Sequence, residues 1–382
     1  GIQSSGQWQH TMHSLMREAC AAPQCCPTKV PLRRRLHVCA HAVSRALSSQ
    51  LPASMCSRRG HVATFALAHP NGSSVASQVQ VDSLSQPRSA AASRPGQTAT
   101  LLLQCPDSKG VVASTAQLLY GLGCNIISSD QFTDVATNTF FQRIDFSYED
   151  LLVGSANTTI LERAVAELAT RFTMQWKISY RNKPKRLAIL VSKLDHCLWD
   201  LLIRHKSGEL YCEIPIILSN HPDLQHIADT FGVPFRVLPV GKDNKQEQEA
   251  VIESALEELG IDCIILARYM QIFSHDFCMR HAEHTINIHH SFLPAFEGAK
   301  PYHRAHERGV KIIGATAHFA TAELDAGPII DQHTTRITHR DSVSDMIRKG
   351  RDLERLVLAR AVRWHLDDRV LVSGNKTVVF ED

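Results

Sequence analysis

An amide, an imidazole and a carboxylate in the second half of the chain are the residues best suited to do chemistry. Asn287 and His289 end a short apolar run that starts at Thr285, and Asp325 follows in the segment Asp325-Ala-Gly-Pro. A side-chain amide can stabilise an oxyanion, while an imidazole and a carboxylate can move protons. Together they form a minimal set for transferring or hydrolysing an acyl group without a covalent intermediate. The sequence therefore predicts an enzyme.

Two adjacent histidines compete for the catalytic role. Neighbouring side chains on a strand point to opposite faces, so Asn287 shares a face with His289 and not with His290. We therefore predict a catalytic set of Asn287, His289 and Asp325, with His290 packed or facing solvent. His318, on a later apolar run, is a further candidate for a place near this site.

Other features that could suggest chemistry are interpreted as structural. Ser291 lacks the Gly-x-Ser-x-Gly elbow of a serine nucleophile. His303-x-x-His306 has a helical spacing that could bind a metal, but no third ligand follows at an obvious spacing. We predict an exposed polar face there and no metal site. Gly-rich nucleotide-binding loops are absent from the sequence, so neither a nicotinamide nor an ATP site is expected.

The elements that must position the site alternate between strands and helices. Strand-like runs and helical stretches that follow one another predict a doubly wound, mostly parallel α/β sheet, with ligands at the carboxyl ends of its strands. Strands are expected at 187–191, 214–218, 235–239, 263–267, 285–288, 311–318 and 328–337, and helices at 246–259 and 342–366. We assign residues 186–382 to this domain.

A smaller domain is expected at residues 98–182. Hydrophobic spacing there gives the order βαββαβ, which fits a ferredoxin-like sandwich. Strands are expected at 100–105, 124–132, 139–147 and 173–180, and helices from about 111 to 122 and at 158–171.

The first part of the chain differs in composition from the rest. Residues 1–97 contain ten of the 41 Lys and Arg residues but two of the 38 acidic ones, so the remaining chain has a net charge of −5. An Arg- and Ser-rich segment poor in acids is typical of an organellar transit peptide, so we expect a leader over 1–69 and a mitochondrial location ahead of a plastid one. A disordered tail and untranslated sequence read through are the alternatives. Residues 70–97 resemble a disordered linker.

Composition also limits the partners and the redox state. A mildly acidic body argues against nucleic acid as the main ligand. No run reaches the roughly 18 apolar residues of a membrane span. The body holds six cysteines and no Cys-x-x-Cys pair, so buried free thiols are expected (Cys105, Cys124, Cys197, Cys212, Cys263 and Cys278).

The smaller domain resembles an ACT domain, through its βαββαβ order and its Cys-Pro-Asp107-x-x-Gly110 sequence. Asp107 could cap the following helix, Gly110 allows close approach of a ligand or a second chain, and Asn125 follows at a turn. The resemblance implies pairing with another copy and amino-acid binding at the junction. We therefore expect a homo-oligomer and a regulatory site at these three residues, with no effector assigned.

The larger domain resembles the formyltransferase fold of folate-dependent enzymes. The resemblance rests on Asn287-Ile-His289, Asp325-Ala-Gly327 and the strand that ends in His318-Phe319. It also rests on a segment that lines the pterin pocket in that family (Leu266-Ala-Arg-Tyr-Met270-Gln271-Ile272). Leu266, Met270, Gln271, Ile272 and His318 are therefore expected to bind the folate.

An ACT-like domain ahead of a formyltransferase-like domain resembles the formyltetrahydrofolate deformylase family over about residues 98–382. Glycinamide ribonucleotide transformylases cradle the phosphate of their amine substrate in a Gly-rich loop after the first strand. Here that place reads Ser192-Lys-Leu-Asp-His-Cys-Leu-Trp199, with no glycine, so the backbone cannot face a phosphate in that way.

The resemblance implies hydrolysis of 10-formyltetrahydrofolate to tetrahydrofolate and formate, in one-carbon metabolism and purine biosynthesis, with no cofactor beyond the folate. Asn287 would hold the oxyanion, His289 would protonate the leaving nitrogen, and Asp325 would pair with His289 and position the water. Either Asp325 or His289 could be the formal base. The alternatives are formyl transfer to an amine, and a regulatory amino-acid-binding protein with an inactive catalytic-like domain.

Overall fold

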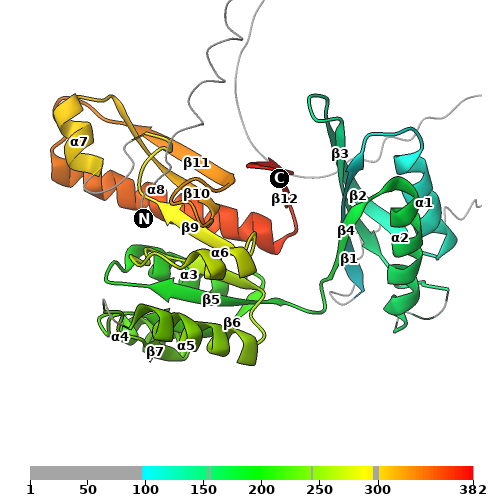
Figure 1. Cartoon of the computed structure of the whole chain (residues 1–382), viewed down its shortest axis with the longest axis horizontal. Helices are drawn as coiled ribbons and strands as arrows, with labels where there is room; N and C mark the ends of the chain where they lie inside the picture. The colour runs from blue at the N-terminus through cyan, green and yellow to red at the C-terminus, as the bar shows by residue number, and fades with distance from the viewer. Residues whose placement is uncertain (1–96, 153, 155, 242–243, 296–300, 382) are drawn as a thin grey trace, which may run out of the picture. The chain divides into compact units, whose positions relative to one another are not determined.

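The computed structural model describes residues 97–381, apart from residues 153, 155, 242–243 and 296–300 (Figure 1). The predicted leader, and all but the last residue of the predicted linker, lie outside the described residues. Within the described ranges, no helix has both the length and the apolar character that a membrane crossing requires. This part of the chain forms a four-stranded sheet, a seven-stranded sheet and a two-stranded hairpin.

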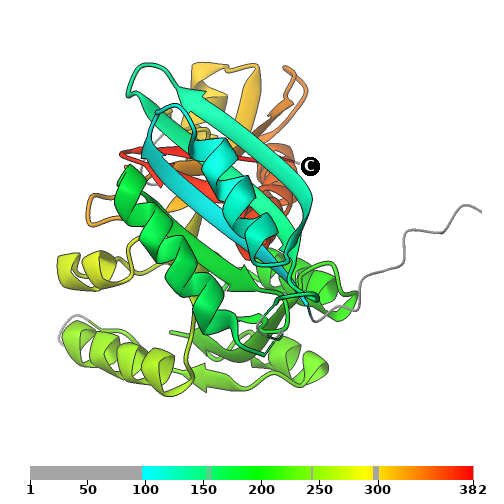
Figure 2. The same ribbon diagram turned by 90° about the vertical axis from the view of Figure 1, so that its right-hand side faces the viewer.

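The four-stranded sheet confirms the predicted βαββαβ order. Its strands lie in the order β2-β3-β1-β4, with every neighbouring pair antiparallel. Helices α1 and α2 cover one face of this sheet (Figures 1 and 2). The elements are β1 (Thr98–Pro106), α1 (Val111–Gly121), β2 (Asn125–Asp134), β3 (Thr139–Ser147), α2 (Thr158–Phe172) and β4 (Gln175–Tyr180).

Apolar spacing explains how this small domain holds together. In α2, the buried residues Leu161, Val165 and Ala169 recur every four positions, so they form one stripe on the helix. Leu161 and Val165 join a buried cluster with residues of β1 and β3, including Leu101 and Phe146. The sequence predicted this domain well because its core depends on local periodicity.

The seven-stranded sheet confirms the predicted mostly parallel α/β architecture. Its strands lie in the order β11-β10-β9-β8-β5-β6-β7, and β10 runs antiparallel to both of its neighbours. The strands are β5 (Lys185–Val191), β6 (Cys212–Ser219), β7 (Phe235–Val237), β8 (Cys263–Leu266), β9 (Thr285–His289), β10 (Ile312–Phe319) and β11 (Ile329–Arg336). The helices are α3 (His196–Lys206), α4 (Gln225–Phe231), α5 (Lys245–Glu258), α6 (His275–Arg280), α7 (Pro301–Arg308) and α8 (Val343–Leu366).

The central strand β5 shows why this sheet is covered on both faces. Leu187, Ile189 and Val191 belong to one buried cluster, which also contains residues of α3 and α8. Ala188 and Leu190 belong to a second cluster, which contains residues of α5 and α6. Successive side chains on a strand point to opposite faces, so a strand buried on both sides becomes a continuous apolar run.

Helix α8 closes the domain along the side of the sheet that includes β9, β10 and β11. It starts with a complete capping box, in which the Ser342 hydroxyl accepts from the Asp345 backbone N–H while the Asp345 carboxylate accepts from that of Ser342. Its buried face is apolar except for one acid, Glu354, which is 2% exposed. A buried acid needs partners, and those partners lie at the candidate site.

Some elements lay outside the sequence predictions. Helices α3, α4, α6 and α7 are short or mixed in polarity, and the hairpin of β12 (Val370–Ser373) and β13 (Lys376–Val379) follows α8. All six cysteines of the described residues are buried and free, as predicted. On α7, both His303 and His306 are exposed.

Candidate active site

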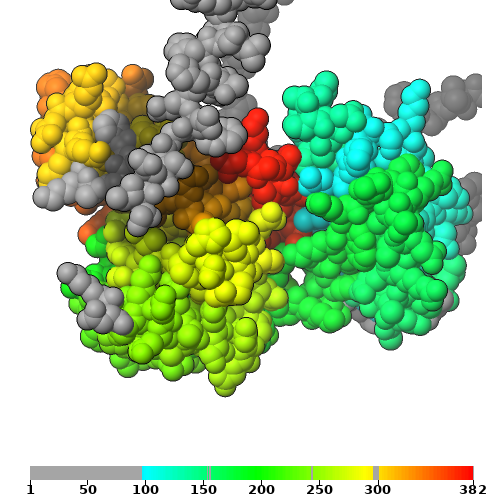
Figure 3. All heavy atoms as spheres, viewed as in Figure 1, coloured from blue at the N-terminus to red at the C-terminus, as the bar shows by residue number. Residues whose placement is uncertain are grey.

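A cavity of about 670 Å³ lies where the carboxyl ends of β8 and β9 meet the loop after β10. This is where ligands are expected in an open α/β sheet. Figure 3 shows all atoms of this face of the molecule, with the yellow-orange atoms of α7 at the upper left and the yellow atoms of α6 near the centre. Every residue that the sequence assigned to catalysis or folate binding lines this cavity (Asn287, His289, Asp325, Leu266, Met270, Gln271, Ile272 and His318).

Strand β9 delivers the amide and the imidazole. Asn287 and His289 are two residues apart, and both line the cavity, as alternation along the strand predicts. Across the antiparallel pair, Asn287 lies opposite His318 and His289 lies opposite Thr316. Strand pairing therefore holds Asn287 from both β8 and β10, and His289 from β10.

The loop between β10 and β11 delivers the carboxylate. Asp325 has a φ of 56°, a left-handed conformation that Asp tolerates better than most residues. Gly327 is required two residues later, because a Cβ there would lie 1.9 Å from the carbonyl oxygen of Phe319. This tight turn brings the Asp325 Oδ1 atom to 3.1 Å from His289 Nδ1.

The electrostatics of this pair favour an ionised carboxylate. Burial opposes ionisation of Asp325, but the hydrogen bond from His289 and the nearby histidines outweigh it and hold the pKa of this carboxyl below its ordinary value. The other ring nitrogen, His289 Nε2, is buried and has no hydrogen-bond partner among the described residues. That nitrogen remains available to a substrate atom.

His318 supports the pair from β10. Its Nδ1–H donates to the carbonyl of Phe319 at 3.0 Å, so its Nε2 can accept from the Asn287 side-chain amide at 3.2 Å. Burial lowers the pKa of His318, which keeps this ring neutral. An amide carries two N–H donors, so Asn287 retains one for a ligand while His318 orients it.

His290 packs as expected, but it also lines the cavity, which strand alternation did not predict. Strand β9 ends at His289, so alternation no longer governs the direction of the next side chain. The two imidazoles stack with ring centroids 4.9 Å apart, and Arg268 Nη1 donates to His290 Nδ1 at 2.7 Å. Burial and the positive charge of Arg268 lower the pKa of His290 to about 4.

A buried polar cluster next to His290 was missed by the sequence analysis. The Glu354 carboxylate accepts from His196 Nε2 at 2.7 Å and from the Tyr302 hydroxyl at 3.0 Å, and lies 3.4 Å from Arg268 Nε. Burial opposes ionisation of Glu354, but its bond to His196 and the charge of Arg268 lower its pKa. In the sequence, the only indication of this cluster was Glu354, a single acid among the apolar positions of α8.

The segment after β8 forms the apolar side of the cavity. Met270 and Ile272 are 61% and 60% exposed, so they present apolar surface at the cavity. The backbone N–H of Met270 donates to the Ser192 hydroxyl at 3.0 Å, and the Tyr269 and Phe273 rings stack 5.6 Å apart. A flat aromatic ligand would find apolar contacts here, with the backbone held in place.

The residues assigned to the small domain lie apart from this cavity. Asp107 and Gly110 lie at the β1–α1 junction, whereas Asn125 starts β2 at the opposite end of α1 and of the sheet, and none of the three lines the cavity among the described residues. The expectation that Asp107 caps α1 is wrong, because Gly110 is the N-cap residue and no side chain caps this helix. Gly110 has a φ of 96° with open space around it, so the left-handed turn is what requires glycine.

One group of side chains has the spacing of a metal site. His196, Cys197 and Glu354 each place a ligand atom within 4.8 Å of the others. The Glu354 carboxylate, however, is already shared between His196, Tyr302 and Arg268. Burial also raises the pKa of Cys197 well above its ordinary value, which disfavours the thiolate that a metal would bind. These contacts do not favour a metal.

The arrangement as a whole can polarise and hydrolyse an acyl group. Asn287 has an N–H for an oxyanion, His289 Nε2 can exchange a proton with a reacting atom, and Asp325 is an ionised acceptor beside that imidazole. An apolar wall on one side fits an aromatic carrier of that acyl group.

Comparisons with known proteins agree with this chemistry. Residues 185–362 match the formyl transferase family. The chain is 54% identical over 283 residues to a formyltetrahydrofolate deformylase of Synechocystis sp., covering 74% of this chain and 98% of the relative. It is 45% identical over 281 residues to the deformylase of Bacillus subtilis, covering 73% and 93%. The crystal structure of a Pseudomonas syringae formyltetrahydrofolate deformylase superposes with a TM-score of 0.72 at 42% identity, covering 75% and 95%.

Proposed function

Because the chain belongs to the formyltetrahydrofolate deformylase family, we propose that it hydrolyses 10-formyltetrahydrofolate to tetrahydrofolate and formate. The observation that carries this proposal is the His289–Asp325 pair beside Asn287 in one cavity. The pair leaves His289 Nε2 unpartnered among the described residues, and it supplies an anionic acceptor for a water proton.

The reaction adds water to the formyl carbon and breaks the bond from that carbon to nitrogen. Asp325 or His289 accepts a proton as the water oxygen attacks, and the carbonyl oxygen becomes an oxyanion that Asn287 holds. His289 delivers a proton from Nε2 to the leaving nitrogen, which departs as the secondary amine of tetrahydrofolate. This is the proton that His289 took from the water or, where Asp325 is the base, one that a protonated His289 already carried. The remaining product is formate and a proton, so no oxidant or group acceptor is required.

The folate is proposed to bind with its pterin ring along the segment Leu266–Ile272. The apolar surface of Met270 and Ile272 and the backbone of this segment favour a flat heteroaromatic ring. Gln271 and the partly buried backbone supply polar groups at the same wall. His318 would act by orienting Asn287, since its own nitrogens already contact Phe319 and Asn287.

The test is an assay of the full chain with 10-formyltetrahydrofolate, with and without glycinamide, that follows both formate and tetrahydrofolate. We expect equal amounts of both products without any amine, and loss of both in Asp325→Asn. Turnover that needs the amine would instead favour formyl transfer. No turnover under either condition would favour a regulatory protein with an inactive domain.

Several finer features are part of the same proposal. We propose that the small domain acts as an ACT domain, which binds an amino acid near Asp107, Gly110 and Asn125 and pairs copies of the chain into a homo-oligomer. Its βαββαβ fold and the glycine turn at Gly110 support this. Isothermal titration with the common amino acids, and light scattering of the full chain, test these two points.

We further propose a mitochondrial enzyme of one-carbon metabolism and purine biosynthesis, directed by residues 1–69 as a transit peptide, with a plastid as the less favoured location. The acid-poor, Arg-rich composition of this segment supports the proposal. Fusion of residues 1–97 to a fluorescent protein tests it. No cofactor beyond the folate is proposed, since the acid–base set can act alone, and activity that survives dialysis against a chelator would agree.

A further inference from the structure

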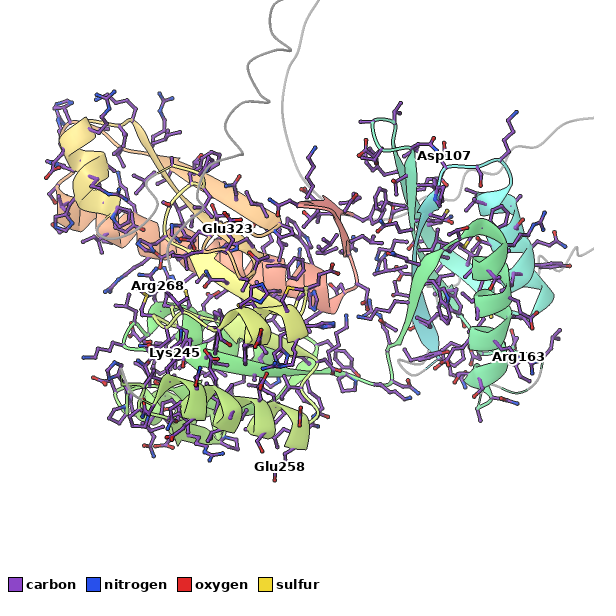
Figure 4. All side chains as sticks on the ribbon, viewed as in Figure 1. Asp107, Arg163, Lys245, Glu258, Arg268 and Glu323 are labelled. Carbon is purple, nitrogen blue, oxygen red and sulfur yellow. The ribbon has the colours of Figure 1, made fainter. Side chains whose placement is uncertain are left out.

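We propose that Arg268 closes the polar end of the cavity against amines, and so reserves the formyl carbon for water. The inference rests on the proposed hydrolysis and concerns how the site selects its nucleophile. Arg268 lies on the segment after β8 and is labelled in Figure 4. Its guanidinium bridges His290 and Glu354, at 2.7 Å and 3.4 Å.

The cavity has two walls of different chemistry that meet at His289. On one side, the apolar segment that includes Met270 and Ile272 fits the folate. On the other side, Arg268, His290 and the cluster around Glu354 line the same cavity. The His289–His290 stack, at 4.9 Å, places this polar end directly beside the reacting imidazole. The Arg268 side chain therefore takes up space in the cavity close to that imidazole, where a second reactant would need room.

The backbone at Arg268 is held in a conformation that its residue type does not favour. Its φ is 64°, in the left-handed region that residues other than Gly, Asn or Asp disfavour. The side chain is nevertheless 10% exposed, buried within the site and not extended into solvent. The fold therefore accepts a strained backbone at a position where the side chain fills part of the cavity.

Charge gives a second reason for this placement. An ionised carboxylate beside a cavity attracts ammonium groups, and Glu354 is the acid at this end. Arg268 lies within 3.4 Å of that carboxylate and so occupies the place that an amine would take. With His196 and Tyr302 on its other lone pairs, Glu354 is 2% exposed and has little capacity left for a ligand.

His290 lies between Arg268 and His289 and is the second part of this barrier. Its hydrogen bond to Arg268 fixes its tautomer. Its Nδ1 accepts from Arg268, so the remaining proton of the neutral ring is on Nε2. The neutral ring stacks on His289 without adding a second positive charge there. Charged and titratable groups that face His290 are Arg268, His289, Glu354 and Asp325, and Tyr302 lies 6.2 Å away, ring to ring.

Removal of the Arg268 side chain should therefore admit an amine. In that reaction the formyl carbon forms a bond to the amine nitrogen and breaks its bond to the folate nitrogen. The amine loses one proton and the folate nitrogen gains one, so the products are a formamide and tetrahydrofolate. Water and the amine would then compete for the same formyl carbon, with the same three catalytic residues.

The experiment compares the wild-type chain with Arg268→Gly and Arg268→Asn in the presence of glycinamide. Both replacements tolerate a positive φ and are much shorter than arginine. Formate and N-formylglycinamide are measured together by mass spectrometry, with a sample without enzyme as the blank. We expect formate alone from the wild type, and N-formylglycinamide at least tenfold above the blank from both variants. Thermal unfolding of each variant identifies any that fail to fold. If one variant does not fold, the other still provides the test.

The matched control is Glu283→Gly, which introduces glycine at another residue with positive φ (61°) that is exposed and does not line the cavity. It should behave like the wild type. Folded variants that release formate but no formylglycinamide would overturn the inference and leave the hydrolysis intact. So would formylglycinamide from the wild type, or loss of all turnover in both folded variants. A wild type that releases no formate would instead remove the proposed function.

Discussion

His289 and His290 are adjacent and identical in type, yet their surroundings give them opposite tasks. His289 faces the Asp325 carboxylate at 3.1 Å, with its second nitrogen unpartnered among the described residues. His290 accepts a hydrogen bond from the Arg268 guanidinium at 2.7 Å, and its pKa is lowered to about 4. An imidazole beside an anion can carry a proton through a reaction. An imidazole beside a cation stays neutral, and here it only lines the cavity.

The difference teaches that residue type alone does not identify the catalytic histidine. The nearest charged group decides whether the charged form of the ring is favoured. On the Asp325 side the site is arranged for proton transfer. On the Arg268 side it is arranged to keep one ring neutral and to satisfy Glu354. Substitutions on either side of the site should remove one part of this contrast at a time.

The largest effect is expected where the anion is removed. In Asp325→Asn the side chain keeps its shape but can no longer orient the imidazole as an ionised acceptor, so kcat/KM should fall by about 10⁴-fold. The measurement is formate release from 10-formyltetrahydrofolate. Glu323→Gln is the matched control, because Glu323 is an exposed acid in the same loop (Figure 4). A loss within tenfold for Asp325→Asn would remove this carboxylate from the mechanism.

A smaller loss is expected when the oxyanion donor is removed on the same side. Asn287→Ala should raise the barrier by about 3 kcal/mol, a reduction of kcat on the order of 10²–10³-fold with little change in KM. Steady-state kinetics separate the two parameters. His318→Gln should reduce kcat less, because His318 acts on the substrate only by orienting the Asn287 side chain. If His318→Gln costs more than Asn287→Ala, these two roles are assigned the wrong way round.

The smallest effect should appear in stability on the Arg268 side, as a dependence on pH. The folded-state pKa of His290 is about 4, below its ordinary 6.5, so the unfolded chain binds more protons between these values. The wild type therefore loses free energy of unfolding as the pH falls from 6.5 toward 4. His290→Gln lacks this term and should gain about 2 kcal/mol relative to the wild type between pH 7.5 and pH 5. Urea unfolding at both pH values measures it, and a difference that does not change with pH would contradict it.

Local patterns made most of the fold predictable from the sequence. The spacing of Leu161, Val165 and Ala169 identified α2, and the continuous apolar run of β5 identified a strand buried on both faces. Family resemblance then brought Asn287, His289 and Asp325 together, and these residues do line one cavity. The fold prediction succeeded because periodicity carries the information, while the catalytic roles of these three residues stay predictions.

The Arg268 side of the cavity could not be predicted in the same way. His196 and Glu354 are 158 residues apart, and only the folded chain brings them within 2.7 Å. The backbone at Arg268 is left-handed, but the residue is neither glycine nor asparagine, so the sequence gives no sign of this conformation. Strand β9 also ends one residue before His290, so alternation along the strand could not predict the direction of that side chain. A buried acid among the apolar positions of α8 was the available clue, and it does not name its partners.

The most direct test of this account compares His289→Gln with His290→Gln in the same assay of formate release. Glutamine preserves polar contacts of similar reach but cannot carry a proton as imidazole does. We predict that kcat/KM falls by about 10²–10⁴-fold for His289→Gln, the usual contribution of a general acid–base, and by no more than about tenfold for His290→Gln. Equal losses, or a larger loss at His290, would contradict the assignment of catalysis to the imidazole that faces Asp325.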